Sequence, residues 1–70
     1  MKTLSLPLLS STVVSRRKAM KLTQADLAKS IGMNRSMLSK LETQGYTPSI
    51  DQLQAIAKFL GFDPTELFIE

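Results

Sequence analysis

The sequence predicts an all-α domain of five helices, with a helix-turn-helix formed by the second and third. Apolar residues recur at helical spacing along most of the chain, and four helix starts carry the same capping pattern. Within the stretch Gln24–Glu42, Gly32 separates two amphipathic segments and can adopt the positive φ of a sharp turn. A chain of 70 residues is expected to form a single domain, residues 1–70.

The N-terminal segment has the weakest pattern. Residues 1–6 show no helical period, so we expect an N-terminal arm, although the alternation of Leu4, Leu6 and Leu8 also fits a short strand. The helical core is expected over residues 7–68, because Pro7 suits a first helical position. The first helix should extend to about residue 20, with four residues facing inward: Leu9, Val13, Val14 and Met20.

Capping residues mark the later helix starts. Thr23 precedes the second helix, Asn34 the third, Ser49 the fourth and Asp63 the fifth. The third helix should end near residues 43–44, the fourth at residue 61 and the fifth near residue 68. The apolar faces of the second, third and fourth helices predict these core residues: Leu27, Ala28, Ile31, Met37, Leu38, Leu41, Ile50, Leu53, Ile56, Ala57 and Leu60.

Charge is distributed unevenly along the chain. The totals, 9 Lys+Arg and 6 Asp+Glu, give a net charge of +3. Residues 1–40 hold eight basic side chains and one acidic one, a charge of +7, whereas residues 41–70 carry −4. This asymmetry indicates a basic face for a polyanion and an acidic end turned away from it, with an ordinary solvated surface as the alternative.

The composition also excludes several classes of protein. The chain has no cysteine and no histidine, which removes disulfides, thiol nucleophiles and the usual zinc ligands. We therefore expect no metal, no cofactor and no enzymatic activity. No apolar run reaches the roughly 20 residues of a membrane span, and the N-terminus lacks the cleavage site of a signal peptide. We expect a cytoplasmic protein without membrane contact.

The third predicted helix carries a polar face opposite its apolar one. Short polar side chains flanked by long cations fit the major groove of DNA, because they let the helix approach and offer donors to base edges. The predicted base-reading residues are Arg35, Ser36, Ser39 and Lys40. Phosphate contacts are expected at helix starts and in the loop after the third helix, from Gln24, Asn34, Thr43, Gln44 and Tyr46. Packing within the loop is the alternative for Tyr46.

Over roughly residues 9–68 the sequence resembles the Cro/C1-type (XRE) family of bacterial and phage helix-turn-helix proteins. The resemblance is carried by Arg17, Leu22–Gln24, Leu27–Ala28, Ile31–Met33, Leu38–Ser39, Leu41–Glu42, Pro48–Ser49, Leu53, Ile56–Ala57 and Leu60–Gly61. It implies a lambda-repressor-like fold that binds double-stranded DNA. It also implies an ion pair between Arg17 and Glu42, and a Gln24 that binds phosphate and braces Arg35.

Two positions depart from the pattern of this family. The family usually has glycine where Lys21 and Gln44 stand, and here Gly45 follows one residue late. We therefore expect the turn after the first helix and the end of the third helix to differ from the family.

Together these features predict a sequence-specific transcription regulator, a repressor that binds a palindromic operator as a homodimer through the major groove. The expected dimer surface is C-terminal and consists of Phe62, Leu67, Phe68 and Ile69, with closure of the core as the alternative role. The alternative function is an antitoxin that holds a toxin protein and autoregulates its operon. Controller proteins of restriction systems are a further candidate of the regulator kind.

Overall fold

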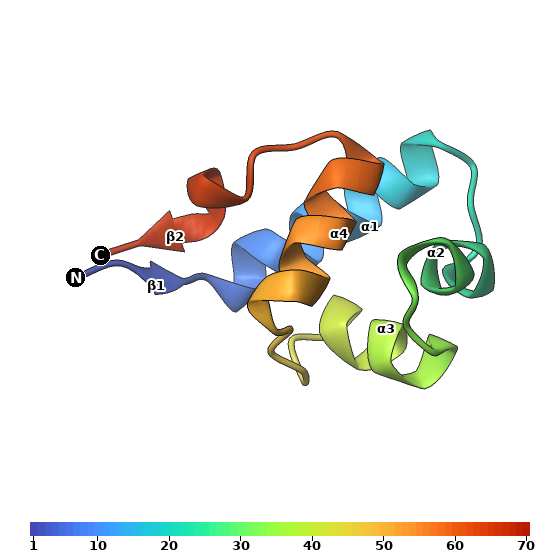
Figure 1. The fold of residues 1–70 in the computed structure, drawn as a ribbon, viewed down its shortest axis with the longest axis horizontal. Coiled ribbons are helices and arrows are strands. Elements are labelled where there is room, and N and C mark those ends of the chain that lie inside the picture. The colour runs from blue at the N-terminus through green and yellow to red at the C-terminus, as the bar shows by residue number, and fades with distance from the viewer.

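The computed structural model describes all 70 residues and contains four α-helices, one 3₁₀ helix and a two-stranded ribbon (Figure 1). In chain order the elements are β1 (Thr3–Leu4), α1 (Leu6–Ala19), α2 (Gln24–Ile31), α3 (Arg35–Glu42), α4 (Ile50–Leu60), η1 (Pro64–Leu67) and β2 (Phe68–Ile69). The all-α fold with a helix-turn-helix is confirmed. The predicted fifth helix is replaced by η1 followed by β2.

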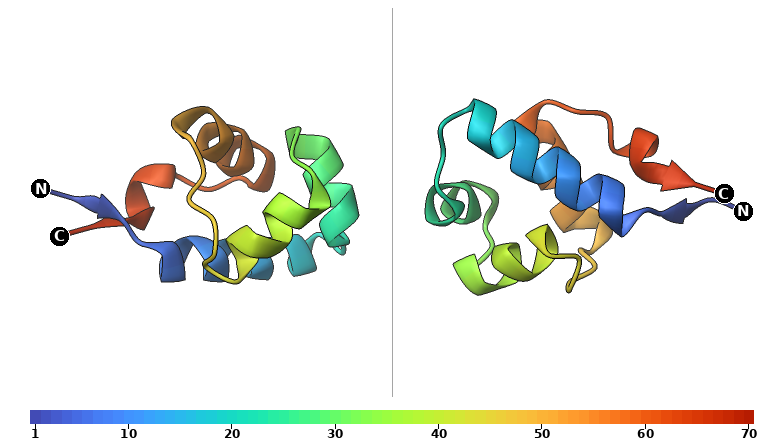
Figure 2. Two further views of the ribbon diagram at one scale, coloured as in Figure 1. Left: turned by 90° about the horizontal axis from the view of Figure 1, so that it is seen from below. Right: turned by 180° about the vertical axis from the view of Figure 1, so that it is seen from behind.

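The molecule is elongated, with extents of 34 × 21 × 19 Å. The two termini lie together at one end, and α2 and α3 close the other (Figure 1). Seen from below, α1 and α4 lie on opposite sides of the core (Figure 2). Twelve buried residues form this core: Leu9, Val13, Leu27, Ala28, Ile31, Met33, Leu38, Leu41, Leu53, Ile56, Leu60 and Leu67.

Two predicted core residues are instead exposed. Ile50 is 64% exposed, because it is the first residue of α4 and precedes the buried stripe that begins at Leu53. Met20 is 45% exposed, because α1 ends at Ala19 and Met20 is only its C-cap. Val14 and Met37 are half-buried at the edge of the core.

The N-terminal residues are tied to the C-terminus. Strand β1 pairs antiparallel with β2, with Thr3 opposite Ile69 and Leu4 opposite Phe68. The backbone N–H of Ser5 then donates to the carbonyl of Leu67 at 2.8 Å. The structure thus contains the short strand in place of a free arm over residues 1–6. The helical core begins one residue earlier than predicted, since Ser5 caps α1.

Helix starts follow the predicted capping pattern. Thr23 and Ser49 each form a complete capping box with the residue three positions later. The side chain of Asn34 accepts a hydrogen bond from the backbone N–H of Met37 at 2.7 Å. Each of these capping hydrogen bonds lies within the first turn of the helix that it caps. The sequence alone therefore sufficed to locate these starts.

The 3₁₀ helix η1 is capped by a carboxylate. Asp63 accepts hydrogen bonds from the hydroxyl and the backbone N–H of Thr65, which lower the pKa of Asp63 below 3.8. Because the folded pKa is lowered, this cap stabilises the fold above about pH 3.8 and is lost as the pH falls through the lowered pKa.

All four α-helices end in the same left-handed turn. Gly32 and Gly61 adopt φ values of 72° and 78°, and Lys21 and Gln44 adopt 59° and 66°. In each turn the next backbone N–H reaches the carbonyl five residues earlier, at 2.7–3.1 Å. The expected difference after α1 and α3 is therefore wrong for the backbone. Gly45 is not left-handed, and the non-glycine residue before it carries the strain.

A nearly buried ion pair joins α1 to α3. Arg17 Nε lies 2.7 Å from Glu42 Oε2, and Arg17 Nη2 donates to Glu42 Oε1 at 3.1 Å. The two side chains are only 13% and 5% exposed. Arg17 Nη1 also donates to the carbonyl of Leu22, and Gln24 Nε2 donates to Glu42 Oε1, both at 2.9 Å. This ion-pair network fixes α3 against α1 and the start of α2.

The left-handed residue after α3 provides a test of backbone strain. A non-glycine residue in this conformation destabilises the fold by about 1–2 kcal/mol. Replacing it by glycine removes this strain, but part of the gain is offset because glycine has more conformational freedom in the unfolded chain. Gln44→Gly should therefore raise the free energy of unfolding by about 0.5–1 kcal/mol, measured by urea denaturation. Gly32→Ala is the matched control. An added Cβ at this position meets no atom, so the variant tests only the cost of the φ of 72° for alanine, and it should lower the free energy of unfolding. A destabilised Gln44→Gly protein would contradict this account.

The ion-pair network predicts an asymmetry between single and double substitutions. Arg17→Met leaves the carboxylate of Glu42 nearly buried with one donor, so unfolding should become easier by about 3 kcal/mol. The double variant Arg17→Met/Glu42→Leu should lose less free energy of unfolding than Arg17→Met alone, because no unpaired charge remains in it.

The neighbouring Arg16 offers a control for this experiment. Its side chain is exposed and bonds only to carbonyls, so Arg16→Met should cost much less in the same urea titration. Equal losses for Arg16→Met and Arg17→Met would show that the ion pair is not what holds α3.

Candidate nucleic-acid interface

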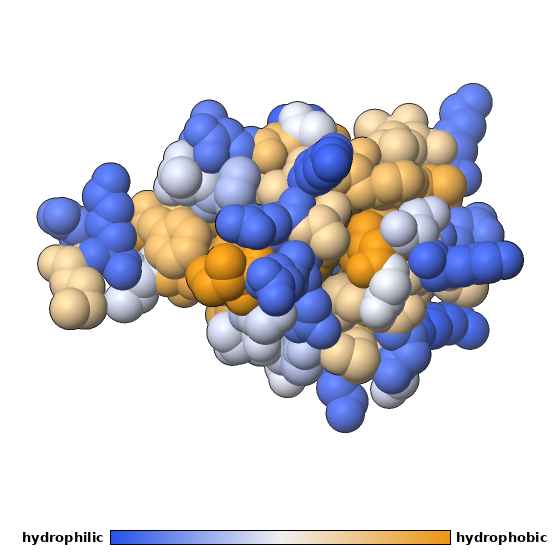
Figure 3. Space-filling view, viewed as in Figure 1, coloured by the Kyte–Doolittle hydropathy of each residue, from blue (hydrophilic) through white to orange (hydrophobic).

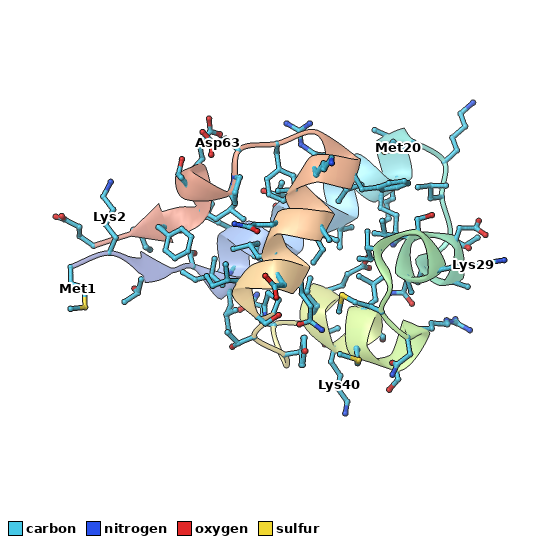
Figure 4. The ribbon with its side chains drawn as sticks, in the orientation of Figure 1. Met1, Lys2, Met20, Lys29, Lys40 and Asp63 are labelled. Atoms are coloured by element: carbon cyan, nitrogen blue, oxygen red, sulfur yellow. The ribbon has the colours of Figure 1, made fainter.

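The four predicted base-reading residues lie on one side of α3. At about 100° per residue they fall within a sector of about 140°, opposite the buried Leu38 and Leu41. Arg35, Ser36 and Lys40 are exposed and Ser39 is half-buried. None of their side-chain polar groups is used inside the chain, since the hydrogen bonds of this helix involve its backbone and its caps. Figure 4 shows Lys40 extending away from the body of the molecule.

A shallow hollow lies beside the start of α2. It is lined by five residues from α1, α2 and α3: Arg17, Thr23, Gln24, Ala25 and Arg35. The structure therefore brings the predicted phosphate contact Gln24 next to the predicted base reader Arg35. The free backbone N–H groups of a helix start and a guanidinium group suit an anion. Gln24 donates one N–H of its amide to Glu42 and keeps the other for a ligand.

The other predicted phosphate contacts differ in whether their side chains already have hydrogen-bond partners within the chain. Asn34 uses its side-chain oxygen as the cap of α3, which leaves its amide N–H groups free. Gln44 is exposed, with its side chain unengaged. The hydroxyl of Thr43 donates to the carbonyls of Ser39 and Lys40, at 3.2 and 3.1 Å. Thr43 therefore acts first as a cap of the helix end.

Tyr46 is engaged within its own loop. Its hydroxyl donates to Gln52 Oε1 at 2.7 Å, and its ring is half-buried against the core. The same Gln52 oxygen accepts the backbone N–H of Ser49 in the capping box. The hydroxyl proton of Tyr46 is thus already used, and the packing alternative fits its geometry better than a phosphate contact.

Two basic residues of α1 are used inside the molecule. Arg17 belongs to the ion-pair network, and Arg16 Nη1 donates to the carbonyls of Leu60 and Gly61 at 3.3 and 3.1 Å. The guanidinium of Arg16 also lies 5.8 Å from the centre of the Phe62 ring. Sequence reasoning missed this role of Arg16 because its partners lie 44 and 45 residues away. The basic run at residues 16–18 therefore contributes less free charge than its composition suggests.

Four of the seven exposed, unpaired lysine and arginine side chains lie at the helix-turn-helix, and the other three are Lys2, Lys18 and Lys58. Lys21, Lys29, Arg35 and Lys40 are exposed and form no ion pair. Figure 4 shows Lys29 and Lys40 projecting from α2 and α3 into solvent. In the space-filling view, hydrophilic side chains project from this end of the molecule (Figure 3). The end formed by α2 and α3 is therefore the one suited to a polyanion.

The predicted dimer surface needs a correction at Leu67. This residue is 4% exposed in the single chain and belongs to the core, so it has almost no surface to offer a second copy. Phe62 lies under Arg16, and Phe68 pairs with β1 and is half-buried. Only Ile69, at 48%, remains an exposed large apolar side chain of this set.

The structure contains no group of three or more acidic side chains placed to hold a metal ion. None of its helices combines the length and the apolar character that a membrane span requires.

Comparison with known proteins agrees with this geometry. A helix-turn-helix family model matches residues 14–67. The immunity repressor protein of Bacillus phage phi105 is 44% identical over 45 residues, which are 64% of this chain. The matched region spans only 31% of that repressor's length.

Two solved structures share the fold. The restriction-modification controller protein C.AhdI from Aeromonas hydrophila has a TM-score of 0.78 and 28% identity, over 90% of this chain and 96% of that one. The DNA-binding domain of the P22 c2 repressor has a TM-score of 0.76 and 30% identity, over 96% of this chain and 84% of that one. With the match over residues 14–67, these findings show that the chain belongs to the Cro/C1-type helix-turn-helix family of DNA-binding transcription regulators.

Proposed function

We propose that this protein is a sequence-specific repressor that binds a palindromic operator as a homodimer, with α3 in the major groove. The observation that carries the proposal is the polar face of α3, whose side chains are exposed or half-exposed and have no partner inside the chain. Arg35 can donate two hydrogen bonds to one guanine, and Lys40 can reach a guanine or a phosphate. Ser36 and Ser39 are short enough to let the helix approach the bases.

Contacts to phosphate would fix the position of α3 in the groove. The hollow beside the start of α2 places Gln24 next to Arg35, the first residue of α3. A phosphate held there would set how deep the N-terminal end of α3 enters the groove, since phosphate contacts give register and orientation. Because Gln24 also bonds to Glu42, this phosphate contact would be coupled to the ion-pair network.

The names of similar proteins support a regulator over an antitoxin. Two of them are described as repressors, one from phage phi105 and one from P22, and C.AhdI is described as a controller protein. In a homodimer reading a palindrome, the two α3 helices would enter major grooves one helical turn apart, about 34–36 Å.

Selection of bound sequences from random duplex DNA by the pure protein tests this function. We expect an enriched palindrome, and binding to it should weaken steeply with salt, with a log–log slope set by the number of phosphates contacted. Absence of enrichment would contradict sequence-specific binding. An enriched single half-site would contradict the homodimer, and a salt slope near zero would contradict the assignment of a polyanion as the partner.

Arg35 should be the main base reader. Arg35→Ala should weaken binding to the selected site by about 1–3 kcal/mol and relax the preference at one base pair, measured by titration against single-base variants. Lys58→Ala on α4 is the control, since this exposed cation lies outside the helix-turn-helix. If Arg35→Ala weakened binding to random DNA by the same amount, Arg35 would contact a phosphate and not a base.

A further inference from the structure

Lys21 occupies a backbone conformation that favours glycine. It is the left-handed residue after α1, with a φ of 59°, and its N–H bonds to the carbonyl of Lys18 at 3.0 Å. The fold itself needs only a residue that tolerates this turn, and glycine does so without strain. A long cationic side chain therefore stands at a position where glycine would make the fold more stable.

Nothing inside the chain uses the ammonium group of Lys21. The side chain is exposed and makes no ion pair or hydrogen bond, whereas Arg16 and Arg17 in the last turn of α1 are both bonded internally. Strained backbone positions occur at functional sites, and no contact within the chain accounts for a lysine here. The ammonium group is therefore free to bind a ligand at the surface.

The position of Lys21 indicates that ligand. It stands two residues before Thr23, the cap of α2, and Thr23 lines the hollow that also holds Gln24 and Arg35. The turn lies at the end of the molecule formed by α2 and α3, opposite the paired termini (Figure 1). DNA with α3 in its major groove would pass its backbone along the start of α2. The cation nearest in sequence to that helix start is Lys21.

We propose that Lys21 binds a phosphate of the DNA backbone beside the groove that α3 enters. The inference rests on the proposed function, because it needs a bound duplex. It adds a cation to the proposed interface, next to the start of α2. Since a phosphate carries no sequence information, Lys21 contributes affinity and not specificity.

Lys21→Gly tests the inference with two independent readouts. Relief of strain should raise the melting temperature by several degrees, which also shows that the variant folds. Loss of the contact should weaken binding about tenfold at 0.1 M salt, equally on the selected site and on random duplex, and the log–log salt slope should fall by about one. Lys21→Arg, which keeps the cation, should keep the slope.

Two further variants separate charge from strain. Lys21→Asn removes the charge but tolerates the left-handed turn, so it should show the same loss of salt slope as Lys21→Gly. Lys58→Gln removes one charge from α4 and should leave the slope unchanged. Wild-type affinity and slope in Lys21→Gly would overturn the inference alone. A wild-type protein that binds no duplex would overturn the proposed function and the inference together.

Discussion

The ion pair between Arg17 and Glu42 is the interaction on which the arrangement of the helix-turn-helix depends. It is nearly buried, and it connects the last turn of α1 to the last residue of α3. Its partners Leu22 and Gln24 add the turn and the start of α2. A buried charge pair offers little net stability, but it tolerates only one geometry because either charge alone would be costly. Its main effect is therefore to fix how α3 is presented.

This use of Arg17 changes how the charge of the chain should be interpreted. The first 40 residues carry +7, yet Arg16 holds the C-terminal carbonyls of α4 and Arg17 holds Glu42. The charge of Arg17 is compensated by Glu42 and attracts a polyanion less than free charge does, whereas Arg16 bonds to neutral carbonyls and keeps its charge. Of the six other cations in this part of the chain, Lys21, Lys29, Arg35 and Lys40 lie on the turn before α2, on α2 and on α3, and Lys2 and Lys18 lie outside these elements. Most of the free positive charge is therefore at the residues that would touch DNA.

Sequence patterns predicted what is decided within one helical turn and missed what distant residues decide. The capping boxes at Thr23 and Ser49 are local, and both are present. The pairing of β1 with β2 joins residues 66 positions apart, and it converts the end of the expected fifth helix into a strand. The pair of Arg17 and Glu42, 25 positions apart, followed only from the family resemblance. The left-handed turn at Gln44 is local, but the sequence pattern missed it because glycine stands one position later.

The packing of the C-terminal residues into the core also limits which surface the proposed dimer can use. In so small a chain, η1 and β2 use the apolar C-terminal residues to complete the single copy, and Leu67 is fully committed. Ile69 stays exposed, but it lies on the ribbon, at the end of a 34 Å long molecule opposite α2 and α3 (Figure 1). Half-sites one helical turn apart require each α3 to lie roughly 17 Å from the two-fold axis. In an end-to-end dimer through the ribbon, the length of each copy would separate its α3 from the two-fold axis (Figure 1). For the proposed homodimer, pairing along the flank of the molecule would bring the two α3 helices closer together than pairing through the ribbon, and so fits half-sites one helical turn apart better.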